Sequence, residues 1–200
     1  MSSKWESSLE SWWEQQGTWQ VFPPVTVTST VEVQDPADAS DPRVDLRHAS
    51  LTVSRDKRTV VVTARLQQPT SPTTPNWWRG TSLPRPGITW GLNFDGSGAW
   101  QYVAHLRGDP DLGAYGFVER GQATPSQVAS VASAFFDGTE YRLQFPMSSF
   151  GGTPTRIRFT VAMHLYADGR GDELLGGDYA PEPAPGTFSD WFTVPVVAGG

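Results

Sequence analysis

The segment VVVTARL, residues 60–66, alternates between two kinds of side chain along its length. Every second residue from Val60 to Leu66 is apolar, whereas Thr63 and Arg65 fall between these positions. Successive side chains of a β-strand point to opposite faces of a sheet, so this period of two predicts a strand with one buried face. The neighbouring segments then decide what kind of sheet the strand joins.

The same period of two recurs along most of the chain. Segments with this pattern, bounded by Gly, Pro, Asp or Ser, are residues 25–33, 60–66, 88–94, 100–106, 115–119, 128–136, 140–145, 156–166 and 191–196. Asp137-Gly138 lies between two apolar runs and predicts a tight hairpin. No helical period follows residue 20, which excludes crossover helices and a parallel sheet. We therefore expect an all-β fold, a single antiparallel β-sandwich of jelly-roll or immunoglobulin-like type with about nine or ten strands.

The first twenty residues have a helical period instead. Ser3 and Glu6 have the spacing of a capping box, and Gly17 marks a helix end. We expect a short amphipathic helix in residues 1–20, followed by the sandwich domain in residues 21–200. Its apolar side chains pack either on the domain itself or on another subunit, and those expected to dock are Trp5, Leu9, Trp12 and Trp13.

Two long segments, residues 68–86 and 167–189, have no strand pattern, and long loops often carry function. The first contains Trp77, Trp78 and Arg79, in a chain with nine tryptophans. Exposed indoles offer a surface on which sugar rings, prolines or a protein partner stack. We expect these three residues to bind a ligand, the alternative being that both indoles cover an open end of the sandwich. Two other tryptophans with strand spacing are expected in the core, namely Trp90 and Trp100.

Acidic residues gather in two loops. One loop holds Asp35, Asp38, Asp41 and Asp45, and the other holds Asp168, Asp172 and Asp178. Carboxylates are ligands that calcium prefers, but Arg170 stands where an EF-hand loop needs an oxygen ligand. Because Asp in β-connections is commonly a turn residue, we expect no metal site and no cofactor, the alternative being a structural calcium ion in these loops.

Catalytic residues are sparse. No nucleophile motif accompanies the three histidines, and His105 and His164 fall opposite the apolar strand positions, which predicts that they face solvent. Glu119 and Glu140 are the strand-borne carboxyl pair that a retaining glycosidase would need, yet nothing in the sequence brings them together. We therefore expect no enzymatic activity.

Composition excludes further classes of function. The 200 residues carry a formal net charge of −6, whereas a nucleic-acid surface needs clustered positive charge. The absence of cysteine excludes disulfides, thiolate metal sites and a cysteine nucleophile. No segment has the apolar core of a signal peptide or the roughly 18 apolar residues of a membrane span. We expect neither a nucleic-acid partner nor a membrane span.

Several stretches resemble one group of β-sandwich domains. They are DPRVDL (residues 41–46), LTVSRDKRTVVVTARL, WGLNFDGSGAWQYVAHL, EYRLQFPMSSFGG and DYAPEPAPGTFSDW. Together they resemble the DOMON-like and family 9 carbohydrate-binding-module-like domains over residues 35–196. The resemblance implies a non-catalytic, extracytoplasmic module that binds sugar, haem or protein, but no ligand residue of the group transfers to this sequence.

The leading hypothesis is therefore a non-catalytic recognition module that binds a carbohydrate or a protein surface through Trp77, Trp78 and Arg79. A second hypothesis is a structural protein, such as a virion or surface-layer component, that forms an oligomer or larger assembly through its N-terminal helix. A third is a β-sandwich glycoside hydrolase. These functions place the protein outside the cell, at the cell surface or in a virion, although the lack of a signal peptide is also compatible with the cytoplasm.

Overall fold

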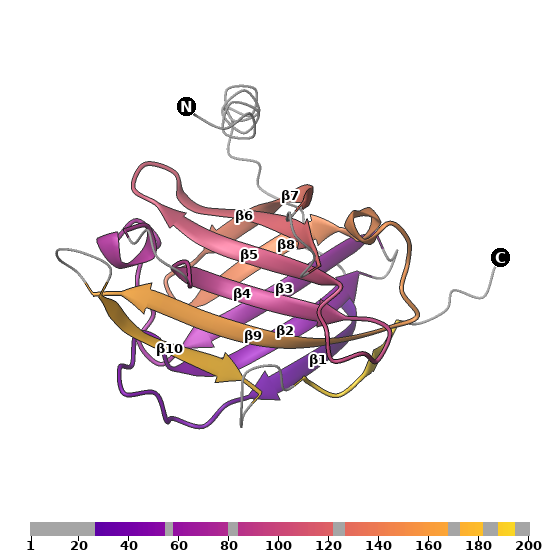
Figure 1. The fold of residues 1–200 in the computed structure, drawn as a ribbon, viewed down its shortest axis with the longest axis horizontal. Helices are drawn as coiled ribbons and strands as arrows, with labels where there is room; N and C mark the ends of the chain where they lie inside the picture. Colours follow the sequence, from indigo (N-terminus) through magenta and orange to yellow (C-terminus); the bar gives the residue numbers. More distant parts are fainter. Residues whose placement is uncertain are drawn as a thin grey trace.

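The computed structural model describes residues 27–54, 58–79, 84–121, 127–167, 173–181 and 188–194. These residues form eleven strands and two short 3-10 helices (Figure 1). The elements are β1 (Val27–Gln34), β2 (Leu46–Ser54), β3 (Thr59–Leu66), η1 (Pro75–Trp77), β4 (Gly87–Asn93), β5 (Tyr102–Asp109), β6 (Gly113–Arg120), β7 (Gln127–Phe136), β8 (Glu140–Pro146), η2 (Met147–Phe150), β9 (Arg156–Tyr166), β10 (Leu174–Ala180) and β11 (Phe192–Thr193).

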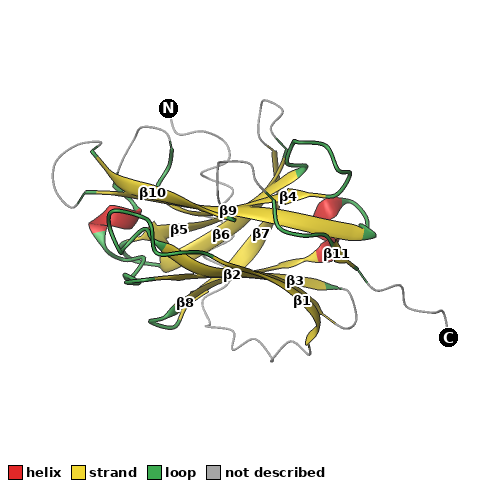
Figure 2. Ribbon diagram, turned by 90° about the horizontal axis from the view of Figure 1, so that it is seen from below, coloured by secondary structure: helices red, strands yellow, loops and turns green. Residues whose placement is uncertain are grey.

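Every strand pairing is antiparallel, and ten strands follow the order β1-β2-β3-β8-β7-β6-β5-β4-β9-β10, with β11 beside β9. The sheet folds over at β7, where Ala132 pairs with Gly116 of β6 and Phe136 pairs with Tyr141 of β8. Two layers result, and the sheet nearly closes into a barrel (Figure 2). The all-β, antiparallel prediction is confirmed, with eleven strands in place of the expected number.

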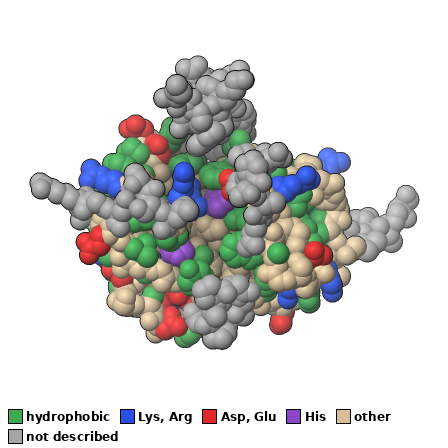
Figure 3. Space-filling model, in the orientation of Figure 1, with side chains coloured by type: hydrophobic (Ala, Val, Ile, Leu, Met, Phe, Trp, Pro, Cys, Tyr) green, Lys and Arg blue, Asp and Glu red, His purple; other side chains and the backbone are tan. Residues whose placement is uncertain are grey.

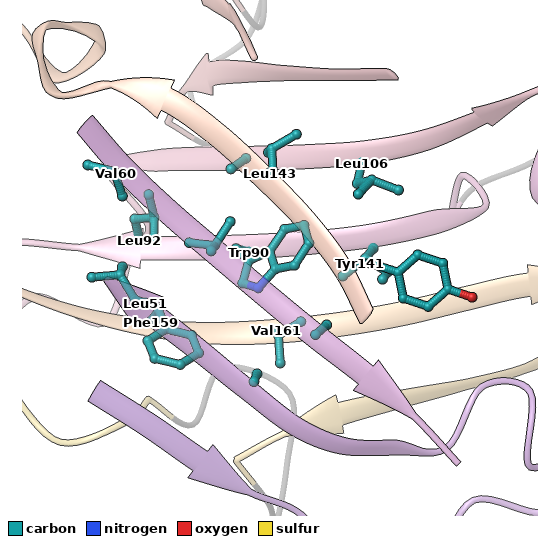
Figure 4. Close-up of a cluster of buried hydrophobic side chains, with 14 of the residues drawn as sticks. Leu51, Val60, Trp90, Leu92, Leu106, Tyr141, Leu143, Phe159 and Val161 are labelled. Atoms are coloured by element: carbon teal, nitrogen blue, oxygen red, sulfur yellow. The ribbon is translucent and has the colours of Figure 1, made fainter. Parts of the chain in front are cut away.

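The core lies between the two layers and follows the alternation seen in the sequence. Figure 4 shows Trp90 of β4 among aliphatic side chains of both layers, including Leu51 and Val60. The Trp90 indole N–H donates to the carbonyl of Thr63 at 3.4 Å and so satisfies its own polar atom across the layers. Each large apolar side chain buried in this way contributes about 1.5–3 kcal/mol. The expectation that Trp90 is a core residue is confirmed.

Local sequence signals predict turns better than irregular strands. The Asp137-Gly138 hairpin is confirmed, since it joins β7 to β8 with Gly138 at φ +98°. By contrast, β10 lies within residues 167–189, where we expected no strand, so that prediction is wrong. Gly176 and Gly177 interrupt the alternation of β10, and the strand is held by pairing with β9.

The described residues contain no α-helix, and none of their helices is long and apolar enough to cross a membrane. The predicted N-terminal helix, with its docking residues Trp5, Leu9, Trp12 and Trp13, lies outside the described residues. Its existence and its role in assembly stay predictions.

Candidate functional site

Two glycines of β4 open the outer face of the layer formed by β10, β9, β4, β5 and β6. Gly87 and Gly91 alternate along the strand with inward-pointing Trp90, so a side chain on either would point outward. A Cβ on Gly91 would lie 2.6 Å from the Trp100 ring, and one on Gly87 would lie 2.9 Å from Nη1 of Arg107. The glycines therefore make room for these two large side chains on the sheet.

A third glycine repeats the arrangement on β10. Gly177 pairs with His164 of β9, and a Cβ on it would lie 2.6 Å from the His164 ring. His164 also pairs with Gly87 on its other side. Three glycines thus accommodate three large side chains on one face: Trp100, Arg107 and His164. With their bonded neighbours these form what we call the outer-face cluster: Trp100, His105, Arg107, Glu119 and His164.

Arg107 of β5 is the charged centre of the outer-face cluster and is only 9% exposed. Its guanidinium donates to Oγ1 of Thr89 at 3.2 Å and to Nδ1 of His105 at 2.6 Å. Burial lowers the pKa of Arg107 to about 10, so the group stays charged at neutral pH. None of the ion pairs among the described residues involves Arg107. The guanidinium therefore hydrogen-bonds to two neutral groups, and the charge of Glu119 acts on it only from beyond ion-pair distance.

His105 connects Arg107 to Glu119. Because a guanidinium can only donate, Nδ1 of His105 accepts, and its proton sits on Nε2, which donates to Oε2 of Glu119 at 3.2 Å. Burial lowers the pKa of His105, which keeps the imidazole neutral at pH 7. The hydrogen bond from His105 in turn lowers the pKa of Glu119. Both ring nitrogens of His105 are thus engaged within the protein.

Aromatic side chains flank the cluster on both sides. The ring of Phe117 stacks on His105 with centroids 4.8 Å apart, and Tyr115 lies 6.4 Å beyond it. On the opposite side the hydroxyl of Tyr179 lies 3.2 Å from Nε2 of His164. Figure 3 looks onto this layer and shows histidine surface beside surface of basic side chains. The cluster therefore combines polar groups held by cross-strand hydrogen bonds with aromatic rings beside them.

Glu119 and Glu140, the carboxyl pair considered for glycoside hydrolysis, lie on different strands and have different partners. Glu119 of β6 bonds to His105, whereas Glu140 of β8 accepts hydrogen bonds from Arg65 at 2.9 Å and from Arg142 at 3.2 Å. Strand β7 separates β6 from β8 in the sheet. Each carboxylate has its own cationic or imidazole partner, so this fold does not form the pair that a retaining mechanism needs.

The expectation that both indoles of the Trp77-Trp78 loop are exposed is wrong for Trp77, which is 1% exposed and belongs to the core. Its Nε1 donates to Oγ1 of Thr70 at 3.0 Å, and its ring lies 4.9 Å from that of Tyr141. A Cβ on Gly108 would overlap with Cβ of Trp77, so this glycine makes room for the tryptophan. Trp77 therefore packs into the core from this loop, as in the alternative in which the loop covers an open end of the sandwich.

Trp78 and Arg79 remain at the surface of the same loop. Trp78 is half-buried, and its Nε1 donates to the carbonyl of Thr73 at 3.1 Å. The guanidinium carbon of Arg79 lies 5.0 Å from the centroid of the Trp78 ring, within range of a cation–π contact. Ligand binding by Trp78 and Arg79 stays a prediction, now without a second exposed indole.

The sequence predicts that His105 and His164 face solvent and does not single out Arg107. His105 and His164 do lie opposite the apolar positions, yet the side chain of His105 is only 13% exposed. Trp100, expected in the core, lies before β5 with its ring over the outward side of Gly91, so that prediction is wrong. The signal that was missed is the pattern GITWG in β4, where glycines occupy outward positions of a strand that is otherwise bulky.

The structure also joins the two acidic loops. One carboxylate oxygen from each of Asp35, Asp38 and Asp178 lies within 4.8 Å of the others, so these residues could hold a metal ion. Asp41 is separate, because Arg43 binds its carboxylate at 2.7 Å. Asp168 and Asp172 lie outside the described residues.

No family model matches this chain, and neither the curated proteins nor the solved structures give a match. The resemblance to DOMON-like and family 9 carbohydrate-binding-module-like domains therefore stays a prediction.

Proposed function

We propose that this protein is a non-catalytic recognition module that binds a carbohydrate carrying a carboxylate, with Arg107 as the residue that receives the carboxylate. The observation that carries the proposal is the burial of a charged guanidinium without a carboxylate bound to it. Burying an unpaired charge costs free energy, so such groups concentrate at functional sites. A ligand carboxylate would supply the missing partner.

The geometry of Arg107 suits an anion with two oxygens. A guanidinium presents a planar set of five N–H donors, which matches a carboxylate in a bidentate arrangement. Thr89 and His105 hold two of the donors and thereby fix the orientation of the plane. Because the orientation is fixed before the ligand arrives, little side-chain entropy is lost on binding.

The aromatic side chains favour a sugar as the carrier of the carboxylate. Trp100 is partly exposed and lies over Gly91, on the same outward side of the layer as the outer-face cluster. An indole offers a broad apolar surface for the C–H face of a pyranose, and adjacent hydrogen-bonding groups select its hydroxyls. An extracellular or cell-surface location would bring such a module to acidic glycans.

The hydrogen bonds of His105 favour binding over catalysis. A general base needs a ring nitrogen free to take a proton from the substrate. In His105 one nitrogen accepts from Arg107 and the other donates to Glu119. His105 therefore acts as a positioning residue for Arg107.

Binding to a panel of acidic and neutral oligosaccharides tests the proposal. We expect the wild-type protein to bind one or more uronate-containing glycans and Arg107→Met to bind none of them. Arg142→Met is the matched control, since Arg142 is an exposed arginine on β8 that pairs with Glu140. Its affinity should equal that of the wild type.

Failure of the wild type to bind any acidic glycan would contradict the proposal. Retention of binding by Arg107→Met, with its fold verified by circular dichroism, would contradict it as well. Detectable hydrolysis of a bound glycan would replace the recognition role with an enzymatic one.

A further inference from the structure

A hydrogen bond crosses the gap where the sheet nearly closes. Oδ2 of Asp178, on β10, accepts the backbone N–H of Leu46, the first residue of β2, at 2.7 Å. These residues are 132 positions apart in the sequence, and β10 ends the order of the sheet that β1 begins. Figure 1 shows β1 and β10 along the same edge of the molecule. We call the region between them the seam.

Carboxylates from both sides of the seam converge there. Asp35 follows the end of β1, Asp38 lies three residues further along, and Asp178 comes from β10. One oxygen of each lies within 4.8 Å of the others, and both Asp35 and Asp178 are 5% exposed. Oxygens bound to one calcium ion at 2.3–2.6 Å can be at most about 5 Å apart, so this spacing fits a shared ion.

Asp45 gives an independent indication of a cation. Its side chain is 1% exposed, and neither of its buried carboxylate oxygens accepts a hydrogen bond. Among the described residues, Asp45 forms its ion pair with the half-exposed Arg47, whose Nη1 lies 3.6 Å from Oδ2, too far for a hydrogen bond. Asp45 directly precedes Leu46, the residue bound by Asp178.

Asp45 lies close enough to the other carboxylates for its charge, like that of Asp38, to act on Asp178. Among the described residues, its ion-pair partner is Arg47, at 3.6 Å. Buried charges in folded proteins are paired or coordinate metals, and the carboxylate of Asp45 lacks the hydrogen bonds that would complete its pairing.

We propose that the seam binds one calcium ion between Asp35, Asp38 and Asp178, with Asp45 adding negative charge behind them. The set contains only oxygen ligands, which favours a hard cation over zinc or copper. Calcium accepts irregular sets of carboxylates, carbonyls and waters, whereas magnesium requires near-octahedral geometry. The ion links the segment after β1 to β10 and so holds the two edges of the sheet together.

Calorimetric titration of calcium into EDTA-stripped protein, with thermal melts in EDTA, calcium and magnesium, tests the site. We expect one calcium per chain and a melting temperature several degrees higher in millimolar calcium than in EDTA, because a ligand of the folded state stabilises it. The same concentration of magnesium should raise the melting temperature less.

Asp38→Asn is the decisive variant, since Asp38 is exposed and its replacement leaves the hydrogen bond of the seam intact. We expect it to melt like the wild type in EDTA and to bind calcium about tenfold more weakly or worse. Asp111→Asn, in the exposed turn after β5, is the matched control and should bind calcium like the wild type.

The melting temperature of Asp45→Asn in EDTA and in calcium gives a second test, because a purely structural role of Asp45 would not change the effect of calcium. It should raise the melting temperature in EDTA, because it removes a buried negative charge, and it should reduce the shift caused by calcium. Equal melting temperatures of the wild type in EDTA and calcium would overturn the proposal. Wild-type calcium affinity in Asp38→Asn would overturn it too. Arg107→Met should keep the full calcium response, so this test is independent of glycan binding.

Discussion

At the end of the fold covered by Trp77 and in the outer-face cluster, a glycine makes room for a large side chain. The two regions differ in whether the polar group of that side chain has a partner within the protein. Gly108 makes room for Trp77 at the end, and Gly87 makes room for Arg107 on the outer face. The single polar atom of Trp77 is satisfied by Thr70, whereas the charge of Arg107 has no carboxylate bound to it. The first arrangement serves stability, and in the second we propose that a ligand completes the interaction.

The largest effect is expected at the covered end. Trp77→Ala should lower the free energy of unfolding by about 3–5 kcal/mol, as for other fully buried aromatic side chains. Chemical denaturation measures the loss. Trp78→Ala, which truncates the half-buried neighbour, should cost less than about 2 kcal/mol. Equal losses for the two variants would mean that Trp77 is not the residue that closes this end.

An intermediate effect is expected from pH. Burial lowers the pKa of both His105 and His164 below the ordinary value of 6.5. The unfolded chain therefore binds more protons than the folded one as the pH falls below about 6.5, so the free energy of unfolding must decrease. Above about pH 6.5 both histidines are neutral in the folded and the unfolded chain, so they no longer reduce the free energy of unfolding.

Denaturant titrations at several pH values check this dependence. The double variant His105→Gln, His164→Gln should lose most of the decline below pH 6.5. If the double variant kept the full decrease in the free energy of unfolding below pH 6.5, other titratable groups would be its cause.

The smallest effect on stability is expected at Arg107, although its effect on binding is the greatest. Arg107→Met removes a buried charge, so the free energy of unfolding should stay unchanged or rise by about 1 kcal/mol. The hydroxyl of Thr89, 3.3 Å from Nδ1 of His105, can donate in its place. A loss as large as that of Trp77→Ala would show that Arg107 is a structural residue.

Much of the fold is predictable because its signals are local. The alternation of residues 156–166 predicts β9 with the bounds that the structure has, since one face of the strand is buried along its whole length. Irregular β10 escapes prediction, because its glycines carry no hydropathy signal and its position depends on pairing with β9.

The outer-face cluster is less predictable because strand register creates it. Arg107 lies one residue beyond the predicted strand of residues 100–106, and the structure extends that strand to Asp109. Its partners come from different strands, and His105 meets Glu119 fourteen residues away. No single segment contains this information. The seam is even less predictable, since it brings the segment after β1 next to β10, and these strands stand at opposite ends of the sheet order.

The affinity for an oligogalacturonate and for the same oligosaccharide with its carboxylates reduced to alcohols tests the central claim most directly. Both sugars offer the same ring faces to Trp100, and they differ only in the group that Arg107 would bind. Calorimetry should show binding of the acidic oligosaccharide and at least about tenfold weaker binding of the reduced one, since hydrogen bonds to charged groups contribute about 1.5–3 kcal/mol. Equal affinities for the two sugars, or binding of neither, would contradict the account.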